Sequence, residues 1–368
     1  MDSMSGLYRL SGILSAKGGS IWRNMSSIAA RYAIRKADEE MTCVLYHYPC
    51  NDGAFAALAA HLYHSLLALP VVFVPNSTND PLRAEDFACK KFHTCYLLDF
   101  IGPNEFATKL SQIVNQVVVI DHHKTALDYL QPIEGCDSNI ISVIDMKKSS
   151  ATIAYDYFTQ KLGHANQIEQ CRRTLVAGQN LDRVELLFRY VEDADLWRWS
   201  LPDSKAFNAG LNTKRPNINA IFNPYMFNQL LTLDPATLIA YGNLQLENRE
   251  KLVQNLLNKA FKLNLGGGRF GKCLAVRADE HVNLRSELGN NLSVKSAIEC
   301  LRPIGAVIYE HGGKLKISLR STDDSIDTTE ISRAYGGGGH PGASSFFISR
   351  EEYGEWMLDN LLDICNDI

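Results

Sequence analysis

Short apolar runs alternate with helical segments from about residue 42 onward, and this alternation limits the folds open to the chain. The apolar runs have the length of strands, and the segments between them have the spacing or the alanine-rich composition of helices. Such alternation predicts an α/β fold with a parallel sheet covered by helices on both faces. The expected strands are 43–47, 71–74, 96–99, 117–120 and 141–144, and the expected helices are 54–69, 104–114, 149–162 and 181–195.

A second, smaller domain is predicted near the C-terminus. A long helix over 235–265, ended by three glycines at 266–268, is the natural connector to it, and the Asn- and Pro-rich stretch 202–224 predicts a loop. Later strands and helices alternate in a way that predicts a mixed α/β domain; they are expected at 273–277, 305–309, 314–320 and 345–349, and near 284–292, 328–335 and 351–362. The predicted divisions are 1–40, an N-terminal extension; 41–234, a first domain; 235–267, a linker helix; and 268–368, a second domain.

Composition excludes some functions. The chain has 368 residues and a net charge of −4, so it has no global basic field to attract long nucleic acid. A small or short substrate, bound locally, is favoured over a duplex. No apolar stretch reaches the roughly 18 residues that a membrane span needs, so no membrane partner is expected. The nine cysteines are scattered and odd in number, which favours a reduced compartment.

The first 36 residues differ in composition from the rest. Asp2 is their only acid, serines are frequent, and the basic residues are Arg9, Lys17, Arg23, Arg31, Arg35 and Lys36. This composition is typical of a mitochondrial or chloroplast transit peptide. A disordered cytosolic extension is the alternative. Because Met41 precedes the first expected strand, we expect the folded structure to begin there.

Acidic and imidazole groups follow three of the expected strands. His47 ends the first, with Asp52 after a turn; Asp99 ends another; and Asp121-His122-His123 follows the run 117–120. The carboxyl ends of parallel strands lie at one edge of a sheet, where α/β folds bind their ligands. Oxygen and nitrogen ligands suit Mn²⁺ or Mg²⁺, and the imidazoles favour Mn²⁺. A central carboxylate such as that of Asp99 can bridge two ions about 3.5–4 Å apart.

A run of four glycines followed by a histidine marks the second domain. Gly336 to Gly339 and His340 let backbone N–H groups approach an anion without side chains in the way. Arg320, at the end of an expected strand, can clamp phosphate oxygens with two hydrogen bonds. Arg285, at the start of an expected helix, is a weaker candidate for the same anion. The second domain is therefore predicted to bind phosphate.

Taken together, these motifs resemble the DHH phosphoesterase superfamily with its C-terminal DHHA1 domain. The residues that carry the resemblance are His47, Asp52-Gly53, Asp99, Asp121-His122-His123, Arg320-Ser321 and Gly337-Gly338-Gly339-His340. The two signature motifs occur in the family's order, and the match covers residues 42 to about 350. The resemblance implies a two-domain fold with a di-manganese site in the DHH domain and an active site between the domains.

The resemblance also implies roles for individual residues. His47, Asp52, Asp99 and His122 would be metal ligands, with Asp99 bridging. His123 would face the substrate phosphate or the leaving group, and Asp121 would orient the histidines. The family's fourth metal-binding aspartate lies downstream after a helix, where this chain has Asp193 and Asp195, and we expect Asp193. The glycines Gly337, Gly338 and Gly339, with His340 and Arg320, would bind the substrate.

One position departs from the family pattern. The first motif usually carries two aspartates two positions apart, and the first of them is replaced here by Cys50. A thiolate can bind Mn²⁺ but is softer than this ion prefers, and Asn51 could contribute a carbonyl oxygen instead. The His-x-x-Cys-x-Asp-Gly form resembles a branch of the superfamily. Cys50 is therefore kept as a candidate ligand of the first metal.

The function predicted from the sequence is a Mn²⁺-dependent phosphohydrolase acting on short oligonucleotides or small phosphorylated nucleotides. Two ions are expected, with Mg²⁺ as a substitute, and family members often form homodimers. A nucleotide- or RNA-binding protein with weakened catalysis, its metal site altered at Cys50, is one alternative. A pyrophosphatase or polyphosphatase of the same superfamily is the other, although the glycine–histidine loop resembles the nucleotide-acting branch.

Overall fold

The computed structural model describes residues 19–37, 40–88, 92–103, 105–130, 139–165, 174–176, 178–214 and 217–357. The first 18 residues of the predicted transit segment lie outside this range, as do the ends of two predicted helices at 104 and 358–362. The chain divides into two compact units, Met1–Leu246 and Glu247–Ile368. Among the described residues, no helix combines the length and the apolarity that crossing a membrane requires.

The first unit is built on a five-stranded parallel sheet in the order β2-β1-β3-β4-β5. Its strands are β1 (Thr42–Tyr48), β2 (Val71–Ser77), β3 (Thr94–Leu98), β4 (Gln116–Asp121) and β5 (Ile140–Ile144). The central strands are apolar on both faces: Val44 and Tyr46 of β1 pack into one core, and Cys43 and Leu45 into the other. The predicted fold class is confirmed.

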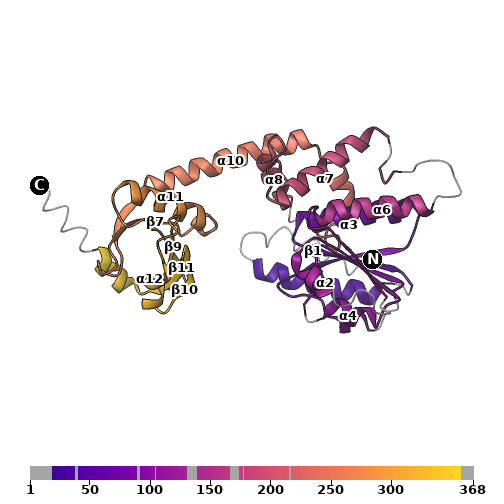
Figure 1. Ribbon diagram of the computed structural model, residues 1–368, viewed down its shortest axis with the longest axis horizontal. Coiled ribbons are helices and arrows are strands. Elements are labelled where there is room, and N and C mark those ends of the chain that lie inside the picture. Colours follow the sequence, from indigo (N-terminus) through magenta and orange to yellow (C-terminus); the bar gives the residue numbers. More distant parts are fainter. Residues whose placement is uncertain are drawn as a thin grey trace, which may run out of the picture. The chain divides into compact units, whose positions relative to one another are not determined.

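Helices cover both faces of this sheet, as Figure 1 shows. One face carries α3 (Asn51–Leu66), α6 (Ser150–Ala165) and α7 (Leu181–Asp195), and the other carries α2 (Gly19–Lys36) and α4 (Phe106–Ser111). The first unit also contains the 3₁₀ turns Ala84–Phe87 and Gly178–Asn180, and the helices α5 (Lys124–Leu130), α8 (Ser204–Asn212) and α9 (Met226–Leu231).

Helix α2 shows that the fold begins before Met41, so the expectation of a start at Met41 is wrong. Ala30 and Ile34 of this helix are fully buried in the second core of the first unit. Arg31 forms salt bridges with Asp80 at 3.1 Å and Asp86 at 3.2 Å. The basic composition that resembles a transit peptide therefore continues into a helix that packs on the sheet.

The predicted loop over 202–224 contains a helix, α8. Close packing against α10 (Pro235–Leu257) explains it, because a Cβ on Gly242 of α10 would lie 1.7 Å from the carbonyl oxygen of Ala206. A Cβ on Gly210 of α8 would likewise lie 2.2 Å from the carbonyl oxygen of Leu238. Asn and Gly, which favour loops in isolation, are accommodated here by tertiary packing.

The described part of the second unit contains a six-stranded mixed sheet in the order β10-β11-β9-β8-β7-β6. In it β7 and β8 pair in parallel, and the other four neighbouring pairs are antiparallel. The strands are β6 (Phe261–Asn264), β7 (Lys272–Arg277), β8 (Gly305–His311), β9 (Lys314–Arg320), β10 (Gly338–His340) and β11 (Ala343–Ile348). Helices α11 (Arg285–Ile298), preceded by the 3₁₀ turn Val282–Leu284, and α12 (Thr329–Ala334) pack against different cores of this unit.

The predicted helix over 235–265 is too long. Helix α10 ends at Leu257, and β6 then pairs antiparallel with β7. The glycines at 266–268 have positive φ and form the turn between these two strands, so they close a hairpin instead of a helix. Leu238 of α10 packs in the first unit and Val253 in the second, so each half of the helix belongs to a core.

Candidate functional site

Polar groups gather where β1, β3 and β4 end. These strands are neighbours in the sheet and run in parallel, so the residues that follow them meet at one edge. His47 lies at the end of β1, Asp99 follows β3, and Asp121 ends β4. Cys50 and Asp52 are added by the start of α3, and Asp195 by the end of α7. Three groups of potential metal ligands result, each with its ligand atoms within 4.8 Å of one another.

Asp99 is shared by two of these groups. Its Oδ2 lies 3.0 Å from Nδ1 of His47, and its Oδ1 lies 3.5 Å from Nε2 of His122 and accepts a hydrogen bond from Oγ of Ser150 at 3.2 Å. The residue has φ of 67°, in the left-handed region that few non-glycine residues adopt and in which aspartate is tolerated better than most. Burial opposes ionisation, but His122 and His47 outweigh it and lower the pKa of Asp99. Its two oxygens therefore face two ligand groups.

The first group consists of His47, Cys50 and Asp99. Burial raises the pKa of the Cys50 thiol far above its usual range, and the carboxylates of Asp99 and Asp52 add to the effect. Without a cation the thiol is therefore protonated. The structure places Cys50 where the sequence motif predicts a ligand, together with His47 and Asp99.

The second group consists of Asp52, His122 and Asp195. Nε2 of His122 lies 3.3 Å from Oδ2 of Asp195 and 3.8 Å from Oδ2 of Asp52. The two oxygens of Asp52 accept hydrogen bonds from the backbone N–H groups of Ser150 (2.8 Å) and Ala151 (2.9 Å), at the start of α6. A helix N-terminus favours a carboxylate in this position.

Asp121 and His123 belong to the third group, which also contains Asp99 and His122. Oδ1 of Asp121 accepts hydrogen bonds from the backbone N–H groups of His122 at 2.7 Å and His123 at 3.2 Å, and lies 2.7 Å from Nδ1 of His123. Asp121 is buried, whereas half of the His123 side chain is exposed. The hydrogen bond to Asp121 raises the pKa of His123 and directs its other ring nitrogen away from Asp121.

The expectation that Asp193 joins the ligands is wrong, because the structure places Asp195 there. Asp193 instead accepts hydrogen bonds from the backbone N–H groups of Ser200 (2.9 Å) and Leu201 (3.3 Å), and from the hydroxyl of Ser200. Burial raises its pKa, but the hydrogen bonds from Ser200 and Leu201 lower it overall. Asp193 therefore holds the turn that follows α7.

The donor atoms in the first two groups fit divalent cations. Imidazole nitrogens and carboxylate oxygens converge, and the carboxylates repel one another when no cation is bound. Burial and the charges of Asp99 and Asp195 raise the pKa of Asp52, while burial and Asp99 raise that of Asp195. The pKa of His122 is raised to about 9 by Asp99, Asp52 and Asp195, against the opposing effect of its burial. Cations in place of these protons would relieve the repulsion.

Gly53 makes this packing possible. A Cβ at this position would lie 2.4 Å from the carbonyl oxygen of His47 and 3.0 Å from its nitrogen. Only glycine lets the first turn of α3 approach the end of β1 so closely. The Asp52-Gly53 pair therefore combines a candidate ligand with the residue that lets it reach the site.

In the second unit, the structure brings Arg320 and Arg285 near each other. Nη2 of Arg320 donates to Oγ of Ser286 at 3.3 Å, and the arginine stem lies over Gly289, whose added Cβ would be 2.6 Å from Cγ of Arg320. Burial, followed by the charge of Arg285, lowers the pKa of Arg320. The neighbouring positive charges of Arg320 and Arg285 favour the binding of an anion close to both.

The four glycines at 336–339 differ in why the structure needs a glycine at each position. A Cβ on Gly337 would lie 2.2 Å from the carbonyl oxygen of Ser345, and one on Gly339 would lie 2.4 Å from that of Ala343. These two glycines are therefore required by packing against β11. Gly336 and Gly338 face open space, and His340 is exposed in β10. The structure shows that close packing of the protein itself explains part of the glycine run.

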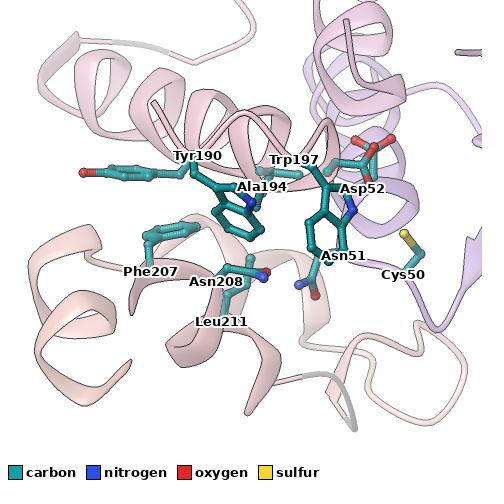
Figure 2. Close-up of a pocket in the computed structure, with 12 residues that line it drawn as sticks. Cys50, Asn51, Asp52, Tyr190, Ala194, Trp197, Phe207, Asn208 and Leu211 are labelled. Carbon is teal, nitrogen blue, oxygen red and sulfur yellow. The ribbon is translucent and has the colours of Figure 1, made fainter. Parts of the chain in front are cut away.

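A pocket that the sequence analysis missed opens beside the second ligand group (Figure 2). It has a volume of about 190 Å³ and includes Asp52 and Asp195 in its wall. Its other lining residues are Cys50, Asn51, Tyr190, Val191, Ala194, Trp197, Trp199, Phe207, Asn208 and Leu211. The pair of tryptophans after Asp195 was the sequence signal that could have indicated it.

Comparison with known proteins identifies distant relatives. No family model matches the sequence. An uncharacterized protein, R106, of Acanthamoeba polyphaga mimivirus is 22% identical over 84% of this chain and 68% of its own length. Oligoribonuclease NrnB of Bacillus subtilis is 26% identical over 70% of this chain, and the aligned part spans only 60% of that relative. The likeness to an oligoribonuclease agrees with the resemblance to the DHH phosphoesterase superfamily.

Solved structures give weaker likenesses. An exopolyphosphatase-related protein from Bacteroides fragilis is 14% identical, with a TM-score of 0.35, over 92% of this chain and 96% of that one. RecJ from Thermus thermophilus in complex with Mn²⁺ is 14% identical, with a TM-score of 0.37, over 91% of this chain and 53% of that one. With such TM-scores, neither structure places any residue of the site.

Proposed function

We propose that this DHH-like chain is a metal-dependent phosphohydrolase that cleaves a phosphoester bond in short oligonucleotides or small nucleotides. The observation that carries the proposal is the position of Asp99. One oxygen of its buried carboxylate faces His47 and the other faces His122, so a single side chain joins two groups of ligands. A pair of cation sites that share a carboxylate suits the in-line displacement of a phosphoryl group.

His47, Cys50 and Asp99 would hold one cation, and Asp52, His122, Asp195 and Asp99 the other. We propose Mn²⁺ for both, with Mg²⁺ as a substitute, because imidazole ligands favour the former. When bound, such ions supply charge neutralisation and Lewis-acid polarisation of the phosphoryl oxygens.

The chain's own residues would position and protonate the substrate. His123 is held by Asp121 through Nδ1, which leaves its Nε2 to donate a proton to the oxygen that departs from phosphorus. Its half-exposed position lets a substrate approach. Arg320, Gly337, Gly338, Gly339 and His340, with Arg285, would bind a phosphate or nucleotide of the substrate; this role and a substrate site between the domains stay predictions from the resemblance.

Short substrates are favoured for two reasons. A net charge of −4 gives the chain no attraction for long nucleic acid. Its relative from Bacillus subtilis is named an oligoribonuclease, and that similarity supports, for this chain, a short oligonucleotide. We propose a homodimer as the assembly only by analogy with the family.

A substrate panel with the full chain tests the proposal. We expect hydrolysis of dinucleotides or adenosine bisphosphate in Mn²⁺, less in Mg²⁺ and none in EDTA, with cyclic dinucleotides, longer oligonucleotides and pyrophosphate as comparison substrates. Asp99→Asn should lower kcat/KM at least about a hundredfold, because it removes the shared carboxylate. The exposed Asp182→Asn, on α7, is the matched control and should retain activity.

Three results would contradict the proposal in different ways. Activity that survives EDTA would remove the metal mechanism. Nucleotide binding without hydrolysis in any metal would favour the alternative of a binding protein with an altered site at Cys50. Preferential release of phosphate from pyrophosphate would favour the pyrophosphatase alternative.

We also propose that the N-terminal segment directs the chain to mitochondria or chloroplasts. The basic, serine-rich composition of the segment supports this. Because side chains of α2 from Ser26 onward pack in the first unit, cleavage that spares this packing would have to precede Ser26. Fusion of residues 1–18 to a fluorescent protein tests the proposal, and a diffuse cytosolic signal would contradict it.

A further inference from the structure

The turn after Asp195 holds two tryptophans in an unusual way. Trp197 is 77% exposed, and its ring meets that of Trp199 edge-on, with the ring centroids 5.6 Å apart. Both residues have positive φ, 53° for Trp197 and 52° for Trp199, which is a strained conformation for bulky residues. The backbone N–H of Arg198 donates to the carbonyl oxygen of Asp193 at 2.9 Å, and the Asp193 side chain binds Ser200. The surroundings therefore hold two aromatic rings beside the pocket instead of burying them.

Asn51 brings an unused hydrogen-bond acceptor to the same pocket. The residue is 9% exposed, and its Nδ2 donates to Oδ1 of Asn212 at 3.0 Å. Its Oδ1 is buried and has no hydrogen-bond partner. A buried acceptor left without a donor is costly, so its position in a pocket wall calls for a donor from a ligand. Figure 2 shows Asn51 below Trp197, with Asn208 beside it and Phe207 at the far end.

The rest of the wall suits a flat aromatic ring. Tyr190 and Phe207 stack on each other with ring centroids 4.4 Å apart and planes 13° from parallel, which makes one side of the pocket rigid. The volume of about 190 Å³ exceeds the roughly 150 Å³ of a cavity that accepts one benzene ring. Stacking on aromatic side chains combined with a few hydrogen bonds to ring edges is how proteins bind unpaired bases.

We propose that this pocket binds the nucleobase next to the scissile phosphate, by stacking on Trp197 and by a hydrogen bond from a base N–H to Oδ1 of Asn51. This inference rests on the proposed function for the identity of the substrate. Asp52 and Asp195 belong both to the pocket wall and to the second ligand group. A nucleotide whose phosphate lies at that group therefore has its base within reach of the pocket, in the first unit alone.

A binding measurement tests the stacking. The full chain in Mn²⁺ is titrated with AMP and with ribose 5-phosphate, which has the same phosphate but no base, by calorimetry and tryptophan fluorescence. We expect AMP to bind about tenfold or more tightly than ribose 5-phosphate, and Trp197→Ala to remove this difference. Tyr241→Ala, which removes an exposed aromatic ring outside the pocket, should retain it. Equal affinity for the two ligands, or a difference that survives Trp197→Ala, would overturn the inference.

A second pair of variants tests the hydrogen bond. AMP is compared with purine riboside 5′-monophosphate, which lacks the amino group on the base. Asn51→Ala should reduce the preference for AMP about five- to tenfold. Asn212→Ala is the control, because it breaks the same Asn51–Asn212 hydrogen bond but keeps Oδ1 of Asn51. If both variants lose the preference for AMP equally, the cause is the loss of the Asn51–Asn212 hydrogen bond that holds the start of α3. That result would overturn the role of Asn51 in binding the base.

Hydrolysis separates this inference from the proposed function. The full chain and Trp197→Ala are assayed on a dinucleotide and on an abasic analogue of it. A rise in KM that Trp197→Ala causes only for the dinucleotide would support the base pocket. Hydrolysis of both substrates without any effect of the base would overturn the pocket and leave the phosphohydrolase standing. Failure to hydrolyse either substrate, with base-dependent binding of AMP, would overturn the proposed activity and keep the pocket.

Discussion

Asp193 and Asp195 have different tasks because they lie on different sides of one helix. Residues two positions apart in an α-helix point about 200° from each other. Asp195 therefore reaches His122, at 3.3 Å from Nε2, while Asp193 faces the turn that carries the tryptophans. A candidate metal ligand, Asp195, and a structural carboxylate, Asp193, thus lie two positions apart in the sequence.

We expect the two corresponding variants to separate stability from metal binding. Asp193→Asn should lower the free energy of unfolding by about 1–3 kcal/mol, because it weakens the hydrogen bonds to Ser200 and Leu201, and it should retain Mn²⁺ binding. Asp195→Asn should lose at least about tenfold in Mn²⁺ affinity and should not destabilise the metal-free protein, because it removes a repelled charge. Calorimetric titration measures the Mn²⁺ affinity, and thermal denaturation in EDTA measures the stability of the metal-free protein. Loss of Mn²⁺ affinity in Asp193→Asn but not in Asp195→Asn would restore Asp193 as the ligand.

At the scale of elements, α2 completes one face of the first sheet. Ile34 and Ala30 are fully buried against the core that β2 and the turn Ala84–Phe87 also form. Oγ of Ser27 donates to the carbonyl oxygen of Asp80 at 2.8 Å, close to the salt bridges of Arg31. The helix is therefore part of the domain, although its composition resembles that of a targeting segment.

Removal of α2 should destabilise the protein. We expect residues 41–368 to unfold at a temperature several degrees lower than the full chain, because burial of Ile34 alone contributes about 2 kcal/mol. Ile34→Ala in the full chain should reproduce part of the loss, whereas the exposed Ile28→Ala should not. An identical melting temperature for residues 41–368 would show that α2 adds nothing to stability.

At the scale of the whole molecule, the site concentrates negative charge at one edge of the first sheet. Asp52, Asp99 and Asp121 are each at most 2% exposed. A bound cation would offset the repulsion between these negative charges. Metal binding and the stability of the first unit are therefore linked.

Mn²⁺ should therefore raise the melting temperature, by the equivalent of about 2.7 kcal/mol at a concentration one hundred times its Kd. Hydrogen exchange should show the protection at the ends of β1, β3 and β4 and at the starts of α3 and α6, and not in β7 to β9. Asp99→Asn should abolish the shift, and Asp182→Asn should keep it. Protection confined to the second unit would place the cation elsewhere.

The sequence by itself determined the alternating fold of the first unit and most of the candidate metal ligands. Apolar runs of strand length are buried on both faces in a parallel sheet that helices cover. Polar residues directly after parallel strands lie at the same edge of that sheet, independently of the rest of the chain. His47, Asp99 and His122 were predicted for this reason, and Asp52 was predicted to join them after a turn.

Only the tertiary structure decided the parts that depend on contacts between distant segments. Which of Asp193 and Asp195 reaches the site depends on how α7 is rotated against the sheet, and local sequence does not encode that rotation. Helix α8 is stabilised by the close packing of α10 against it. The glycines at 266–268 form a hairpin turn because β6 pairs with β7. The pocket beside Trp197 likewise depends on α3, α7 and α8 meeting, because a cavity is a property of packed surfaces and not of any one segment.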